Sequence, residues 1–124
     1  MRIVIDGMFP AGGRFDPAFV PAGWNATKAD ANVYREVIAP FCRGCHSSFE
    51  STIPNTEDPL AFATAESVRT RATSVVDHIC GSGPLGMPTA EITTAQFFSS
   101  SARAVLLQWL GQPGACAPAI DAAP

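Results

Sequence analysis

Residues 41–46, Phe-Cys-Arg-Gly-Cys-His, are the stretch on which the interpretation of this 124-residue chain depends. They contain the pattern Cys-x-x-Cys-His, which is the attachment signature of a c-type haem. Two thiols at this spacing can each form a thioether with one haem vinyl group, and the following histidine can reach the iron from one face. The spacing predicts one covalently bound haem c, with Cys42 and Cys45 as thioether anchors and His46 as an axial ligand of the iron.

Two other kinds of site use a Cys-x-x-Cys pair, namely a thioredoxin-like redox site and half of a zinc site. A zinc site needs a second ligand pair, and the other histidine, His78, forms no such pair with a neighbour. A thioredoxin-like site has a strand before the motif and a helix after it. Here a helical pattern comes before the motif and a serine-containing loop follows it. The sequence therefore favours haem over a non-haem redox or metal protein.

A second axial ligand is available in residues 83–88, Gly-Pro-Leu-Gly-Met-Pro. A methionine thioether on such a loop can be held over the open face of a haem, and His–Met ligation raises the reduction potential. Met87 is therefore the expected distal ligand. His78 is the alternative, which would give bis-His iron and a lower potential, although a histidine near the end of a helix also suits the helix dipole without any metal. Met8 is a third option.

The haem motif, the Met-Pro loop and an amphipathic helix that ends near Trp109 together resemble a class I monohaem cytochrome c. The resemblance covers roughly residues 30–115. It implies an all-α, small cytochrome c fold, with about three to four helices around one covalently bound haem. The implied haem domain occupies 29–116. An irregular N-terminal extension at 1–28, expected to pack on the domain, and a loose tail at 117–124 lie outside the minimal class I pattern.

The N-terminal extension is rich in glycine and proline and is expected to form a loop or strap, with at most a short strand at 3–5. Its large apolar residues are expected to pack on the core or the haem edge, with a docking patch for a redox partner as the alternative: Met8, Phe9, Phe15, Phe19 and Trp24. Thr27 then caps a predicted helix with Asp30 near its positive end, and Pro40 is expected to end it.

Two further helices follow from the spacing of apolar residues. One is expected over 64–79, with a threonine as its cap. It carries Arg69 and Arg71, which belong either to a solvated face or to a salt bridge with a haem propionate. The other runs over 102–110 with an apolar stripe, and Gly111 is expected to end it in the left-handed conformation.

The four cysteines leave Cys80 and Cys116 outside the haem motif. In an oxidising compartment such a pair tends to join, so a Cys80–Cys116 disulfide is expected, with two separate buried thiols as the alternative. The disulfide would tie the entrance of the Met87 loop to the segment after the last helix. Closing a loop of that size stabilises a protein by roughly 3–4 kcal/mol.

Charge and hydropathy restrict the partners and the location. The net charge is −3 without a basic run, which argues against a nucleic-acid partner, and no apolar run is long enough to span a bilayer. The first residues are not a secretory signal, because Asp6 interrupts the apolar stretch. In the family that the chain resembles, haem is attached after export. We therefore expect a periplasmic or otherwise exported protein whose signal peptide or upstream region is absent from this chain.

The resemblance implies electron transport rather than catalysis, because an iron with both axial positions filled by protein has no vacancy for a substrate. It assigns no catalytic residues. The expected partner is a redox protein: a dehydrogenase, an oxidase or another cytochrome. The chain would serve as a soluble shuttle or as the haem domain or subunit of a larger redox complex. The alternative function is that of a haem enzyme or a gas or redox sensor with a displaceable distal ligand.

Overall fold

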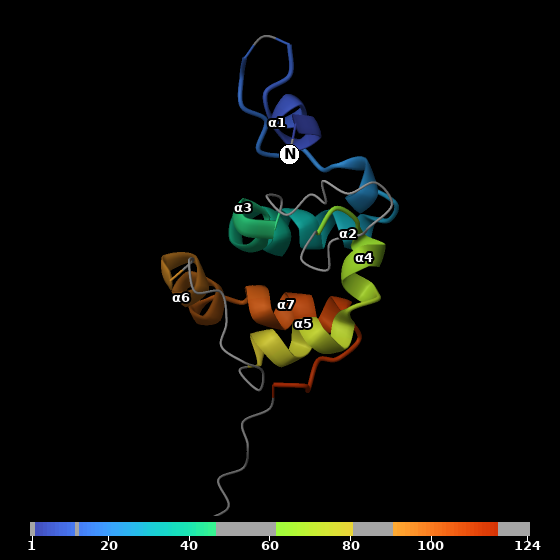
Figure 1. Ribbon diagram of the computed structural model, residues 1–124, viewed down its shortest axis with the longest axis vertical. Coiled ribbons are helices and arrows are strands. Elements are labelled where there is room, and N and C mark those ends of the chain that lie inside the picture. The colour runs from blue at the N-terminus through green and yellow to red at the C-terminus, as the bar shows by residue number, and fades with distance from the viewer. Residues whose placement is uncertain (1, 12, 47–61, 81–90, 117–124) are drawn as a thin grey trace, which may run out of the picture. The chain divides into compact units, whose positions relative to one another are not determined.

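The computed structural model describes the structure of four stretches of the chain, residues 2–11, 13–46, 62–80 and 91–116 (Figure 1). These stretches contain helices and no strand, in agreement with the expected all-α class. By the proximity of its Cα atoms the chain divides into two compact units, residues 1–70 and 71–124. The boundary predicted between residues 28 and 29 falls inside the first unit.

The first unit contains the N-terminal segment and the Cys-x-x-Cys-His motif. Its described elements are α1 (Arg2–Met8), the 3₁₀ helix η1 (Ala22–Trp24), α2 (Lys28–Val33), the π-helix η2 (Tyr34–Cys42), α3 (Arg43–His46) and α4 (Ala65–Arg69). The elements α2, η2 and α3 follow one another without a break. They form one helical run that includes the whole motif.

The helical run begins at the predicted cap, but it does not end at Pro40 as predicted. The Thr27 hydroxyl accepts a hydrogen bond from the Asp30 N–H at 3.1 Å, so Thr27 is the cap. Pro40 was expected to end the helix, but it lies inside η2. In a π-helix each N–H donates to the carbonyl five residues earlier, as that of Arg43 does to Ile38. The wider turn moves the preceding carbonyls away from the proline ring, which removes the clash that breaks an α-helix.

The expectation of a loop or short strand near the N-terminus is wrong, because residues 2–8 form α1. Isoleucine and valine favour strands, but a strand needs a neighbour to pair with, and the described parts of the chain offer none. The Phe9 N–H instead donates to the Ile5 carbonyl at 2.9 Å, as in a helix. The ring of Phe19 lies on Gly7, where an added Cβ would be 2.1 Å from a ring carbon.

The aromatic residues of the N-terminal segment differ in how deeply they are buried. Trp24 is completely buried and its ring centroid lies 5.7 Å from that of Tyr34, so the expected packing is confirmed for this residue. Phe9 and Phe15 are each half exposed and contact each other, with centroids 5.6 Å apart. These two rings are not part of the core of the described residues, and their packing on a haem edge stays a prediction.

The capping residue predicted at the start of the 64–79 helix is confirmed, but the helix is not continuous. The Thr64 hydroxyl accepts from the Ser67 N–H at 3.0 Å, and the Ser67 side chain reaches back to the Thr64 N–H in a capping box. The helix then breaks at Thr70, whose hydroxyl donates to the Ser67 carbonyl at 3.1 Å. Threonine side chains compete in this way with the backbone bonds of a helix. The boundary between the two units follows Thr70 directly.

The second unit contains α5 (Ala72–Ile79), α6 (Glu91–Ser99) and α7 (Ala102–Trp109), and α6 packs on α7. The sequence did not predict α6, whose β-branched and aromatic residues have only moderate helix propensity. The end of α7 is as predicted. Gly111 has φ 73°, its N–H donates to the Gln108 carbonyl, and the next N–H donates to the Leu107 carbonyl at 2.8 Å.

The lengths and hydropathies of the helices also bear on the membrane expectation. Within the described residues, none of the helices combines the length and the apolar character needed to cross a bilayer. This agrees with the prediction from the hydropathy of the sequence.

Candidate functional site

The Cys-x-x-Cys-His motif lies entirely within the helical run of the first unit. Cys42 is the last residue of η2, and Cys45 and His46 belong to α3. Residues three apart on a helix lie on one side of it, about one turn from each other. Cys42 is buried, with 7% of its surface exposed. The backbone therefore brings both cysteine positions to the same side of the helix, as attachment to two vinyl groups of one ring demands.

The imidazole of His46 is stacked on the ring of Phe62. The two ring centroids are 3.8 Å apart and the ring planes differ by 9°. A histidine binds a metal ion through a nitrogen lone pair that lies in the plane of the ring. The stack covers a face of the imidazole and not its edge, so it is compatible with an iron ligand at position 46. The donor set of two thiols and one imidazole fits a haem c.

Residues of the N-terminal segment contact the backbone of Phe62 and of the residue after it. The Trp24 indole Nε1–H donates to the Phe62 carbonyl oxygen at 2.9 Å. The neighbouring Gly23 lies so close that an added Cβ would be 2.5 Å from the Ala63 carbonyl oxygen. Two adjacent residues of η1 thus contact the backbone that carries the stacked ring. Sequence reasoning missed Phe62, because nothing in the local pattern around it points to a residue 16 positions earlier.

The first variable residue of the motif, Arg43, turns towards the start of η2. Its Nη1 donates to the Tyr34 hydroxyl oxygen at 3.3 Å, and its guanidinium carbon lies 6.0 Å from the centroid of the Tyr34 ring. This arrangement combines a hydrogen bond with a cation–π contact. The two contacts hold the positively charged guanidinium of Arg43 against the Tyr34 side chain.

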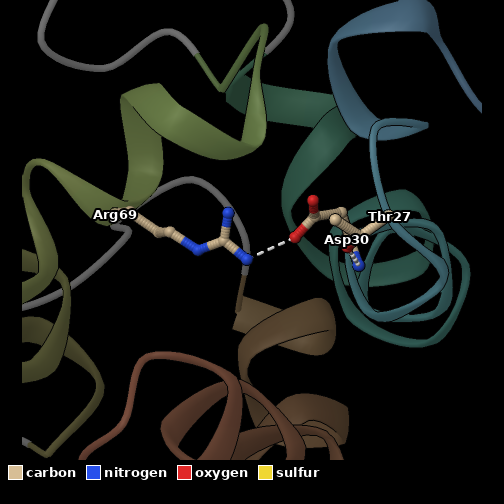
Figure 2. Close-up of polar contacts among 3 residues, drawn as sticks. All are labelled: Thr27, Asp30 and Arg69. Carbon is tan, nitrogen blue, oxygen red and sulfur yellow. Dashed lines mark hydrogen bonds and ion pairs between the residues drawn. The ribbon is translucent and has the colours of Figure 1, made fainter.

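Arg69 pairs with Asp30, a pairing that neither of the two sequence interpretations included. The Arg69 Nη2 donates to the Asp30 Oδ1, and this ion pair links α4 to α2 (Figure 2). The Asp30 side chain is 2% exposed and that of Arg69 is 39% exposed. The same aspartate donates its N–H to Thr27, so it serves both the cap of α2 and the attachment of α4. The role of Arg71, in the second unit, stays open.

The candidate distal ligands lie in different places. Met87 falls outside the described residues and remains the predicted ligand. His78 is exposed on α5, and its Nδ1 lies 2.7 Å from the carbonyl oxygen of Ser74, one turn earlier. That contact fits the interpretation of His78 as a surface histidine near a helix end. Met8 is the last residue of α1 and is half-buried.

The remaining cysteines, Cys80 and Cys116, form a disulfide within the second unit, with their Cα atoms 5.0 Å apart. It joins the residue that follows α5 to the segment after α7. The two cysteines are 36 positions apart. In the chain-entropy model, closing a loop of this length stabilises the folded state by about 4 kcal/mol.

Comparisons of the chain with protein-family models, with curated proteins and with solved structures find no match. The assignment of the site therefore rests on the motif and on the geometry around it. That geometry consists of a buried thiol, a second cysteine position one turn later, and an imidazole stacked on an aromatic ring.

Proposed function

We propose that this chain is an electron-transfer protein that carries one covalently bound haem c. The observation that supports this most strongly is the Cys-x-x-Cys-His motif within an uninterrupted helical run, with Cys42 buried and His46 stacked on an aromatic ring. The small cytochrome c fold with one haem belongs to the same proposal. The all-α character of the described residues is compatible with it.

Each residue of the site has a separate role in this proposal. Cys42 and Cys45 would hold the haem through thioethers, and His46 and Met87 would be the two protein ligands of its iron. When bound, a haem c supplies a one-electron iron couple whose potential depends on its ligands and surroundings. With these two ligands the iron would keep the same ligand set in both oxidation states and would have no position for a substrate. It is therefore proposed as a carrier and not as an enzyme.

The location and the partner follow from the same chemistry. Disulfides persist in oxidising compartments, and Cys80 and Cys116 are joined in the second unit. This supports an exported, for example periplasmic, protein. The proposed partner is a redox protein, either a separate dehydrogenase, oxidase or cytochrome, or the rest of a larger complex.

The test is reversible reduction of the purified protein, followed by exposure of the reduced form to carbon monoxide at neutral pH. We expect the oxidised spectrum to return unchanged after a full cycle of reduction and reoxidation, and we expect no carbon monoxide adduct of the reduced form, because both axial positions would be filled. Rapid formation of an adduct would contradict the electron-carrier proposal. It would favour a haem enzyme or a sensor with a displaceable distal ligand. The variant Met87→Ala is the positive control, because it should bind carbon monoxide.

A further inference from the structure

Phe62 links the N-terminal segment to His46 of the Cys-x-x-Cys-His motif. Trp24 donates its indole N–H to the Phe62 carbonyl oxygen, and the Phe62 ring is stacked on the His46 imidazole. We propose that Phe62 is a positioning residue that fixes the plane of the axial imidazole, and that Trp24 holds Phe62 in place. This inference rests on the proposed function, because it takes His46 to be an iron ligand.

The stack leaves the imidazole little freedom to rotate. Two carbon atoms attract each other best at about 3.5–4.0 Å and repel at shorter distances. With centroids 3.8 Å apart and planes within 9° of parallel, the two rings are already at this separation. Rotation of the imidazole about its Cβ–Cγ bond would drive one of its edges into the Phe62 ring. The stacked orientation is therefore the one that the contact permits.

Phe62 can restrict the imidazole only if Phe62 itself cannot move away. Trp24 has no exposed surface, and its ring packs against that of Tyr34 at 5.7 Å between centroids. Its hydrogen bond to Phe62 is 2.9 Å long. The next residue, Ala63, has its carbonyl oxygen against Gly23, where a side chain would not fit. The backbone at 62–63 is thus held by two neighbouring residues of η1.

Restricting the imidazole plane has a consequence for the iron. Partners outside the ligand set orient metal-bound histidines and tune the metal. The orientation of the imidazole plane decides which iron d orbital interacts with the ligand π system. The orbital that interacts determines the anisotropy of the electron paramagnetic resonance signal of the ferric low-spin haem. It also determines how widely the proton chemical shifts of the haem methyl groups are spread. The N-terminal segment, which lies outside the minimal class I pattern, thereby acquires a role at the iron.

The test compares electron paramagnetic resonance g values and haem-methyl proton shifts in the ferric holoprotein of the wild type and of Phe62→Leu. The leucine keeps an apolar side chain and removes the flat ring. We expect a shift in the principal g values, broader signals and a changed order of methyl shifts. Phe62→Tyr keeps the ring and should restore the wild-type pattern. Phe98→Leu, at a partly exposed phenylalanine of the second unit, is the matched control and should change nothing.

Trp24→Phe provides a second variant, which keeps an aromatic core residue and removes the N–H donor. We expect the same direction of change in g values as for Phe62→Leu. If Phe62→Leu does not take up haem, the g values of Trp24→Phe decide whether the positioning role holds. Haem content is measured on every sample by the alkaline pyridine assay. Haem-loaded variants at Phe62 or Trp24 with wild-type g values and methyl shifts would overturn the positioning role and leave the proposed function intact. A wild type without haem would overturn the proposed function, and the positioning role with it.

Discussion

Arg69→Met should loosen the attachment of α4 to α2, because it leaves the buried Asp30 carboxylate without the guanidinium that lies against it (Figure 2). Methionine keeps a long apolar side chain at position 69 and removes the charge. Asp30→Asn removes the opposite charge at the same volume. The two single variants and the double variant form a cycle that isolates the energy of the pair from the effects of each substitution.

The size of the effect follows from the exposure of the two partners. Removing one partner of a fully buried pair costs about 3–5 kcal/mol, because the other charge remains buried. Here the Asp30 side chain is 2% exposed, but that of Arg69 is 39% exposed. Water already reaches part of the guanidinium, and exposed pairs contribute only about 0.2–1 kcal/mol. We therefore expect a loss of about 1–3 kcal/mol for Arg69→Met and a coupling energy of ~1–2 kcal/mol.

The assay is urea unfolding of the full chain, followed by far-ultraviolet circular dichroism. Arg35→Met is the matched control, because the Arg35 side chain is exposed. Its Nη1 donates a hydrogen bond to the Asn32 Oδ1 at 3.3 Å, and its Nε donates one to the Ala18 carbonyl oxygen at 3.5 Å. It should change the free energy of unfolding by less than about 0.5 kcal/mol. A coupling energy between Arg69 and Asp30 below about 0.3 kcal/mol, the level found for independent sites, would refute the reasoning.

Two further predictions concern the second unit. The double substitution Cys80→Ser and Cys116→Ser should lower the free energy of unfolding by up to about 4 kcal/mol, measured by urea unfolding; an equal stability of the wild type with and without reductant would contradict it. Gly111→Ala should destabilise the chain by about 1–2 kcal/mol in thermal melts, because φ at this residue is 73°. Gly114→Ala, where an added Cβ meets no atom within 4 Å, is its control, and equal melting points for the two variants would count against the left-handed cap.

Features that depend on a few neighbouring residues could be predicted from the sequence. The caps at Thr27 and Thr64 each use a hydroxyl and an N–H three residues later, and the cap at Gly111 uses carbonyls within the last turn. The Cys80–Cys116 pair could be predicted because the other two cysteines belong to the Cys-x-x-Cys-His motif. In each case the chemistry of the residue determines the partner.

Features that depend on distant partners could not be predicted in this way. Trp24 and Phe62 are 38 positions apart, and Asp30 and Arg69 are 39 positions apart. Neither pair has a local pattern that distinguishes it from an ordinary core or surface residue. The prediction that Pro40 ends the helix is wrong for a different reason. Proline has a low propensity for the interior of an α-helix, but here it lies inside a π-helix, whose turn is wider.

The most direct test of the central claim is the alkaline pyridine spectrum of the wild-type protein, purified from a host able to attach haem, together with the spectrum of its oxidised form. We predict a c-type haemochrome, which reports thioethers at Cys42 and Cys45, and a weak far-red band in the oxidised protein, which reports Met87 on the iron. A colourless protein without a haemochrome would contradict the account. A haemochrome without the far-red band would retain the haem and remove Met87 as its ligand.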